Sequence, residues 1–122
     1  MFVQFAELPV FDRDCAKRSY VDHFHCQVIA DVSMDEDGSR WLDLKFPGAE
    51  TAVHFLWRPD ETCSRDPVLV FVAEDFEATA QALASNAVTI NTKLGPAPYN
   101  PRKTVGMIED SESNRIIVIS RR

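Results

Sequence analysis

Side chains that could bind a metal ion or move a proton are few in this sequence and stand far apart. Glu7 is the one candidate for a general base. His23 and His25 have a His-x-His spacing, but that spacing suits a metal only on a strand, and these two close a predicted helix. No Ser-His-Asp or Cys-His order with a glycine elbow is present. Any chemistry therefore depends on which side chains the secondary structure brings to a common face.

The cysteines indicate a reducing environment. Cys15, Cys26 and Cys63 are odd in number and form no CxxC pair. We expect Cys15 and Cys26 to be small core residues and Cys63 an exposed linker thiol. No stretch has the length of a membrane span, and the first residues lack a basic region followed by an apolar run. The sequence therefore predicts a cytoplasmic, soluble protein.

Length and charge limit the classes of partner. The 122 residues suffice for one domain with a real core. Lys and Arg number 13 against 19 Asp and Glu, which gives a formal net charge of −6. Phosphate backbones and anionic lipids are held mainly by basic side chains, so we expect neither nucleic acid nor a membrane surface as a partner.

Apolar periodicity divides the first half into a strand, a helix and three strands. Asp12 or a neighbour is suited to cap the helix. Turn formers, DEDG at 35–38 and PGAE at 47–50, separate the later strands. The predicted elements are a strand over 1–8, a helix over 13–24, and strands over 26–34, 39–46 and 51–57.

The second half repeats this order after a polar linker. A hairpin around DSESN closes the chain, and the segment before it, GPAPYNP at 95–101, reads as a Pro-rich loop. The order β-α-β-β-β thus occurs twice, which predicts an α+β fold of two βαβββ modules forming a curved mixed sheet around a cavity. The single domain, 1–122, would consist of module 1–58, linker 59–66 and module 67–122. The remaining elements are a strand over 68–73, a helix over 74–87, a strand over 88–94, and the hairpin segments 104–110 and 114–121.

Four segments in this order resemble the vicinal oxygen chelate superfamily, which contains glyoxalase-type lyases, extradiol dioxygenases and bleomycin-resistance proteins. They are PVFDRDCAKRSYVDHF, FVAEDFEATAQALASNA, the closing EDSESNRIIVI and RWLDLKFPGAE. The third resembles the family's Asp-Pro-Asp-Gly-Asn-Arg hairpin, with Ser111 in place of Pro and Ser113 in place of Gly. The resemblance covers nearly the whole chain and implies the same fold.

The resemblance also places the family's metal slots. In members that use a metal, four strands each send a His, Gln or Glu into the cavity. Local alignment puts these slots here on Phe5, Phe55, Pro67 and Ile117, none of which can bind a cation. We therefore expect no metal and no other cofactor.

A slip of one residue would exchange the two faces of a strand and is the main alternative. A slip in the fourth strand would bring His54 into the cavity, and a second slip, in the fifth, would bring in Asp66. With Glu7, which shares the face of Phe5, the two slips together would create a weak metal site. We prefer an arrangement in which His54 points to the helix side and finds its hydrogen-bond partner there.

In the preferred register the cavity is lined by apolar side chains, with Glu7 as the nearby charge. Aromatic faces in such a pocket would stack on a planar ligand, although the same side chains could equally fill the cavity. Tyr99 would lie on the rim. The predicted ligand-binding residues are Phe5, Glu7, Phe55, Trp57, Leu69, Phe71, Ile117 and Tyr99, with Val3, Val53 and Ile119 on the same face.

These observations favour a metal-independent protein that binds or sequesters a small apolar or aromatic molecule. The alternatives are a metal-dependent lyase or dioxygenase, a metal-free isomerase with Glu7 as base, or an interaction module with a filled cavity. Exposed apolar sheet edges predict a homodimer. The segment ELPV resembles that of bleomycin-resistance relatives, which implies a first strand exchanged between subunits with Pro9 as hinge. The sequence does not identify the ligand.

Overall fold

A computed structural model describes residues 1–34, 39–60, 66–91 and 95–121, so the DEDG turn at 35–38 and most of the predicted linker lie outside the described residues. The chain divides into two compact units, Met1–Glu61 and Thr62–Arg122. No helix in the described ranges is long and apolar enough to cross a membrane. The elements, in order, are β1 (Phe5–Val10), α1 (Arg13–Phe24), β2 (Gln27–Ser33), β3 (Arg40–Lys45), β4 (Ala52–Trp57), β5 (Leu69–Ala73), α2 (Phe76–Ser85), β6 (Ile90–Asn91), β7 (Pro96–Ala97), β8 (Asn100–Glu109) and β9 (Arg115–Ser120).

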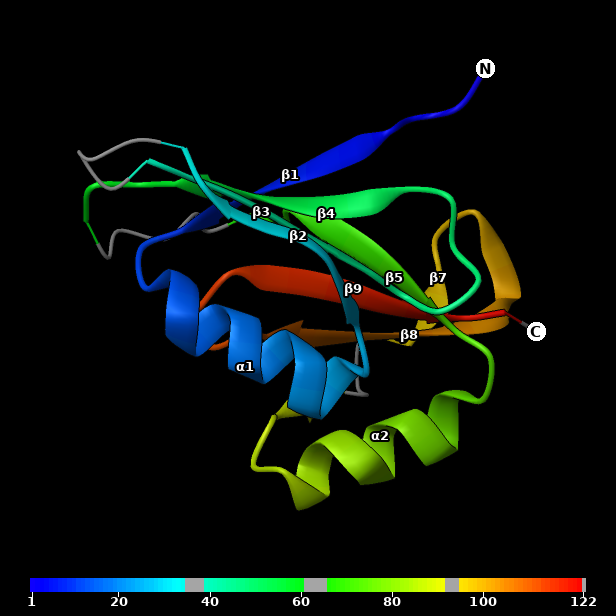
Figure 1. The fold of residues 1–122 in the computed structure, drawn as a ribbon. Helices are drawn as coiled ribbons and strands as arrows, with labels where there is room; N and C mark the ends of the chain where they lie inside the picture. The colour runs from blue at the N-terminus through cyan, green and yellow to red at the C-terminus, as the bar shows by residue number, and fades with distance from the viewer. Residues whose placement is uncertain (35–38, 61–65, 92–94, 122) are drawn as a thin grey trace. The chain divides into compact units, whose positions relative to one another are not determined.

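The two units have the same strand topology (Figure 1). In the first unit the strand order is β1-β4-β3-β2, with β1 parallel to β4 and the other neighbours antiparallel. In the second unit the order is β5-β9-β8-β6, with β5 parallel to β9 and the other neighbours antiparallel. The short β7 pairs with β8 beside this path. The α+β architecture of two βαβββ modules is thus confirmed.

Helix α1 forms where the sequence predicts it. Asp12 caps its start by accepting a hydrogen bond from the Cys15 backbone N–H at 3.0 Å. It ends at His25, whose left-handed backbone (φ 59°) stops further helical bonding. Its buried side chains face one side of the first unit's sheet, where the Tyr20 ring meets that of Phe55 edge-to-face at 5.6 Å between centroids.

That side of the sheet is the core of the first unit. Leu8, Val10 and Phe55 lie there with Leu42 and Leu44, all at most 2% exposed. Since strand side chains alternate between faces, the residues between them must point the other way. Burying each of these large side chains contributes roughly 2 kcal/mol, so this packing decides which face of each strand meets α1.

An ion cluster also joins α1 to β2 and β3. The Arg40 guanidinium binds Asp31 at 2.7 Å and Asp14 at 2.7 Å, and the Lys17 ammonium binds Asp31 at 2.6 Å. The hydrogen bonds from Arg40 and Lys17 hold the pKa of the Asp31 carboxyl well below its usual range. Asp31, on β2, is thereby linked to both β3 and α1.

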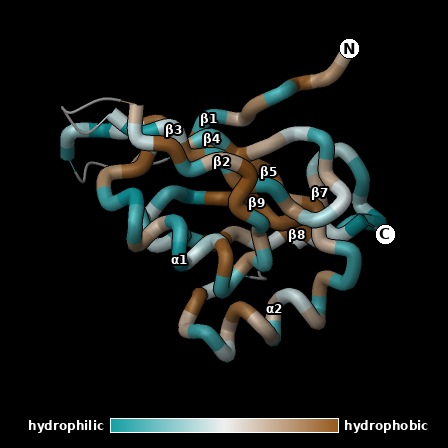
Figure 2. Tube along the Cα trace, in the orientation of Figure 1, coloured by the Kyte–Doolittle hydropathy of each residue, from teal (hydrophilic) through white to brown (hydrophobic). Residues whose placement is uncertain are grey.

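Helix α2 covers one face of the second unit's sheet. Asp75 caps its start by accepting from the Ala78 N–H at 3.1 Å. A Cβ placed on Gly106 would lie 3.0 Å from the Phe76 ring and 2.9 Å from the Ile90 side chain, so this face of β8 lies close to the helix. Figure 2 shows apolar residues along β5, at the edge of the unit's sheet, and along β9, in its interior. The glycine permits the close approach.

The closing hairpin agrees with the prediction, whereas the Pro-rich loop does not. The Asp110 carboxylate accepts hydrogen bonds from the backbone N–H of Glu112 at 2.8 Å and of Asn114 at 2.9 Å, and Ser113 takes a positive φ of 60°. These contacts form the turn of DSESN. The loop expected over 95–101 is wrong, because Pro96–Ala97 forms β7 and Asn100 already begins β8.

Candidate functional site

Strand register places three ionisable side chains in one row across the first unit's sheet. Glu7 of β1 pairs with His54 of β4, and His54 pairs with Asp43 of β3. Paired residues on neighbouring strands project to the same face, about 5 Å apart. Because Leu8 and Phe55 face α1, this row lies on the opposite side of the sheet, which we call the open face.

A buried carboxylate holds the imidazole at the centre of this row. The Oδ1 atom of Asp43 lies 2.6 Å from Nδ1 of His54, and its Oδ2 accepts a hydrogen bond from Nε1 of Trp41 at 2.6 Å. The Asp43 side chain is 4% exposed and that of His54 is 13% exposed. Both oxygens of the carboxylate are therefore satisfied by ring N–H groups, as a buried charge requires.

The same contact selects the tautomer of His54. An ionised carboxylate can only accept hydrogen bonds, so Nδ1 carries the proton in the neutral imidazole. Nε2 then presents a lone pair. No side chain or backbone group of the described residues bonds to Nε2. Nε2 is also not one of the buried atoms without a partner, so it is accessible to a ligand. The arrangement can accept a proton or a hydrogen bond at Nε2.

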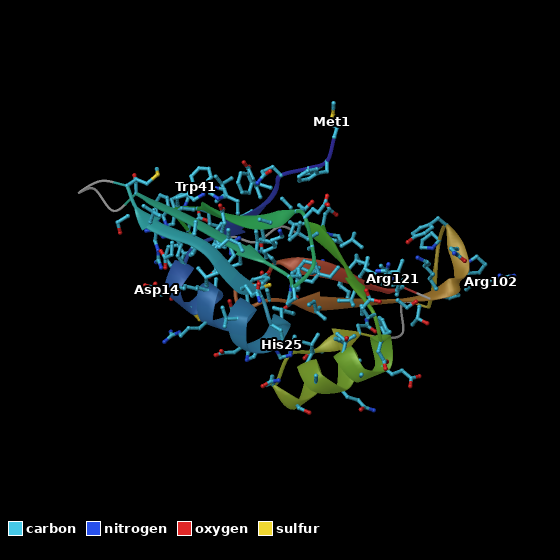
Figure 3. The ribbon with its side chains drawn as sticks, turned by 45° about the vertical axis from the view of Figure 1, so that its right-hand side comes forward. Met1, Asp14, His25, Trp41, Arg102 and Arg121 are labelled. Carbon is cyan, nitrogen blue, oxygen red and sulfur yellow. The ribbon has the colours of Figure 1, made fainter. Side chains whose placement is uncertain are left out.

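Two aromatic rings surround the imidazole. The Trp41 indole lies 4.3 Å from His54 between centroids at 40°, and the Phe5 ring lies 5.8 Å from each of them. Trp41 keeps 37% of its surface exposed. Figure 3 shows Trp41 on the opposite side of the sheet from α1, which carries Asp14. The open face thus offers an apolar, aromatic surface with one imidazole in it.

The predicted face assignment for β4 is wrong by one residue. Phe5 shares its face with His54, whereas Phe55 and Trp57 lie on the side of Leu8 and face α1. Val53 lies on the same face as Phe55. His54 was expected to point to the helix side, but it points to the open face. The reason is that Phe55 fits against Tyr20 in the core. The single polar residue of the run AVHFLW was the available signal for the open face.

A similar displacement affects β5. Ile117 pairs with Val70, and Ile119 with Val72, so these four share a face. Leu69 and Phe71 lie on the other face, the one that Gly106 presents to α2 through its partner Val118. The predicted common face for Leu69, Phe71 and Ile117 is therefore wrong. Since VLVFVA is apolar throughout, only packing against α2 could distinguish its two sides.

The other predicted site residues belong to different units. Glu7 is exposed on the open face, while Asp66 and Pro67 are exposed in the second unit and Tyr99 is 73% exposed there. Within the described ranges no group of three or more His, Cys, Asp or Glu side chains could hold a metal ion.

The second unit also has an open groove of about 680 Å³ beside the start of α2. Its lining includes Glu74, Asp75 and Glu77, together with Phe76, the first residue of α2. Three acidic groups disfavour an anionic ligand despite the helix N-terminus. The groove contains none of the predicted site residues, and we do not treat it as the candidate site.

A profile of the glyoxalase/bleomycin resistance protein/dioxygenase superfamily matches residues 2–118. The chain belongs to this superfamily. This membership explains the duplicated βαβββ topology and confirms the resemblance found in the sequence. A search of curated proteins found no significant match.

Solved structures similar to this superfamily member include three bacterial proteins. An antibiotic-binding protein from Streptomyces sp. CB03234 is 25% identical, with a TM-score of 0.78 over 98% of this chain and 95% of that one. A superfamily member from Sphaerobacter thermophilus is 18% identical (TM-score 0.84; 99% and 98% covered). A glyoxalase family protein from Bacillus anthracis is 10% identical (TM-score 0.79; 100% and 96% covered). The last two show the fold alone.

Proposed function

We propose that this superfamily member binds a small, planar aromatic molecule on the open face of its first unit. The observation that carries the proposal is the cluster of Phe5, Trp41 and His54, whose rings lie within 5.8 Å of one another on a face that α1 does not cover. Offset and edge-to-face contacts with a ligand ring would extend this cluster. Leu56 and Val32, 47% and 54% exposed on the same face, add apolar area.

The similarity to an antibiotic-binding protein supports binding over catalysis. That Streptomyces protein covers nearly the whole chain at 25% identity. Binding requires shape and contact area, whereas catalysis requires preorganised charge where charge develops. Glu7, the expected base, is exposed, and no hydrogen bond or ion pair with another described residue orients it.

We further propose that binding needs no metal. Phe5, Pro67 and Ile117 offer only carbon atoms where the resemblance places metal ligands. The corrected register brings His54 to the face of Phe5, but no group of three or more His, Cys, Asp or Glu side chains in the described ranges could hold a metal ion. The alternative is a metal-dependent lyase or dioxygenase, and finding stoichiometric metal in the purified protein would support it.

Trp41 provides a direct test of binding. The chain has two tryptophans, and Trp57 lies on the other face, so Trp57→Phe leaves Trp41 as the only indole emitter. In this variant we expect planar aromatic compounds to change the emission saturably, and Phe5→Leu to weaken binding by up to about tenfold through loss of the edge-to-face partner. Tyr99→Leu, in the second unit, serves as the control and should bind normally.

Two results would contradict the proposal. One is a broad aromatic library that leaves Trp41 emission unchanged. The other is stoichiometric nickel, zinc, manganese or iron(II) in the purified protein, together with a large rise in melting temperature when that metal is added. Stoichiometric metal would favour the enzyme instead.

A further inference from the structure

We propose that His54 accepts a proton from the ligand, with Asp43 as its positioning residue, so that the open face prefers aromatic molecules that carry an acidic hydroxyl group. This inference rests on the proposed function and names the ligand class. A phenol combines the planar ring that would lie against Phe5 and Trp41 with an O–H group for Nε2.

The first argument is the burial of Asp43. A carboxylate that is 4% exposed has lost most of its hydration, which is costly unless both oxygens are bonded. Its two bonds of 2.6 Å go to the rings of His54 and Trp41. Apolar side chains could pack here without that cost. The carboxylate therefore serves to orient these rings and to keep the Nε2 lone pair of the imidazole directed away from Asp43.

The second argument is the environment of the protonated imidazole. When Nε2 takes a proton, the positive ring lies against Asp43 on one side and 4.3 Å from the Trp41 ring, within the range of a cation–π contact. Glu7 is the register neighbour of His54 on β1 and adds a second, solvated negative charge. These groups are placed around the ring on which the positive charge forms when the ligand gives up its proton.

The proton balance needs no other reactant. The ligand O–H bond breaks, an Nε2–H bond forms, and the electron pair stays on the ligand oxygen. The products are a phenolate and an imidazolium, held as an ion pair with Asp43 behind the ring. Before the proton is transferred, the ligand hydroxyl donates a hydrogen bond to Nε2. An ether at this position has no proton to share and leaves Nε2 without a partner.

The test compares para-nitrophenol with its methyl ether, para-nitroanisole, by titration calorimetry. The two compounds share the nitrophenyl ring, but only the phenol has an O–H proton that it can donate to Nε2. We expect the protein to bind the phenol at least about tenfold more tightly, since a hydrogen bond that involves a charged group is of this size. At a pH low enough that free para-nitrophenol keeps its proton, the absorption of the bound compound should also shift toward that of the phenolate.

Two variants separate the roles of the residues. His54→Gln should lose the preference for the phenol, whereas His23→Gln, a change on α1, should keep it. Asp43→Asn should weaken the preference and change the ring-nitrogen NMR signals of His54, because an amide is uncharged and its single oxygen can accept from only one of the two ring N–H groups, of His54 and Trp41. His54→Gln alone decides the matter if the Asp43 variant does not fold.

The outcomes distinguish this inference from the proposed function. Equal affinity for phenol and ether, or a preference that survives His54→Gln, would overturn the role of His54 and leave the aromatic site intact. Failure of both compounds to bind would overturn the inference as well. The broader Trp41 emission screen then decides the proposed function separately.

Discussion

His54 lies between a buried carboxylate and two aromatic rings, and this arrangement depends on neighbouring residues of three strands. Its ring position is set by Asp43, its stacking by Trp41, and its face by the packing of the next residue, Phe55, against Tyr20. Each contact is short in range. A single substitution in the core can therefore displace the open face as effectively as one within it.

Tyr20 is the residue on which we expect the first unit to depend most. It is fully buried and contacts Phe24 and Phe55, so Tyr20→Ala leaves a cavity that α1 cannot fill. We expect a loss of about 3–5 kcal/mol in the free energy of unfolding, measured by urea titration. Tyr99→Ala, at an exposed position, should change it by less than about 0.5 kcal/mol. Similar losses for both variants would contradict this packing.

Among the elements, α1 is attached to its sheet by two different kinds of contact. Ala16, Tyr20 and Phe24 bury apolar surface, while Asp14 and Lys17 join the ion cluster around Arg40 and Asp31. The apolar contacts are insensitive to pH, whereas the ion cluster titrates. Acid should therefore affect the helix attachment through Asp31.

The sign of that effect follows from the lowered pKa of Asp31. The folded state favours the ionised carboxylate, so Asp31 stabilises the protein above its ordinary pKa of about 4 and loses this contribution as the pH falls further. We expect Asp31→Asn to be less stable than the parent protein at neutral pH, with the difference narrowing below about pH 4. Urea midpoints measured across this range provide the test.

Asp22→Asn is the matched control for this titration, because Asp22 is exposed on α1 and makes no ion pair among the described contacts. Its stability should follow that of the parent protein at every pH. A difference between Asp31→Asn and the parent that stays constant down to about pH 2 would show that the carboxylate acts by packing rather than by charge.

At the scale of the whole molecule, the feature that favours association is the exposed apolar surface of β5. Val70 and Val72 are 62% and 58% exposed on β5, the edge strand of the second unit's sheet. Unpaired apolar edges promote association. We propose that a second copy covers this edge in a homodimer. Exchange of β1 at the Pro9 hinge, and a cytoplasmic location, stay predictions.

Light scattering during size-exclusion chromatography tests the dimer. We expect a species of twice the chain mass of 13.8 kDa. Val72→Lys places a charge on the edge and should shift the protein toward monomer, whereas Glu77→Lys, at an exposed position of α2, should not. A parent protein that is monomeric at every concentration, or a Val72→Lys variant that dimerises as well as the parent, would rule out this interface.

The sequence by itself determined the duplicated order of elements, the start of α1 at Asp12 and the hairpin around DSESN, because apolar period, caps and turn residues act over a few neighbouring positions. It also identified Phe5 and Glu7 as residues of one face. Only the tertiary structure decided the faces of β4 and β5. β5 is apolar on both sides and β4 has only His54 to distinguish its two sides, so the orientation of each strand depends on packing, in β4 on the fit of Phe55 against Tyr20. That choice brought His54 to Asp43, a pairing that local sequence does not contain.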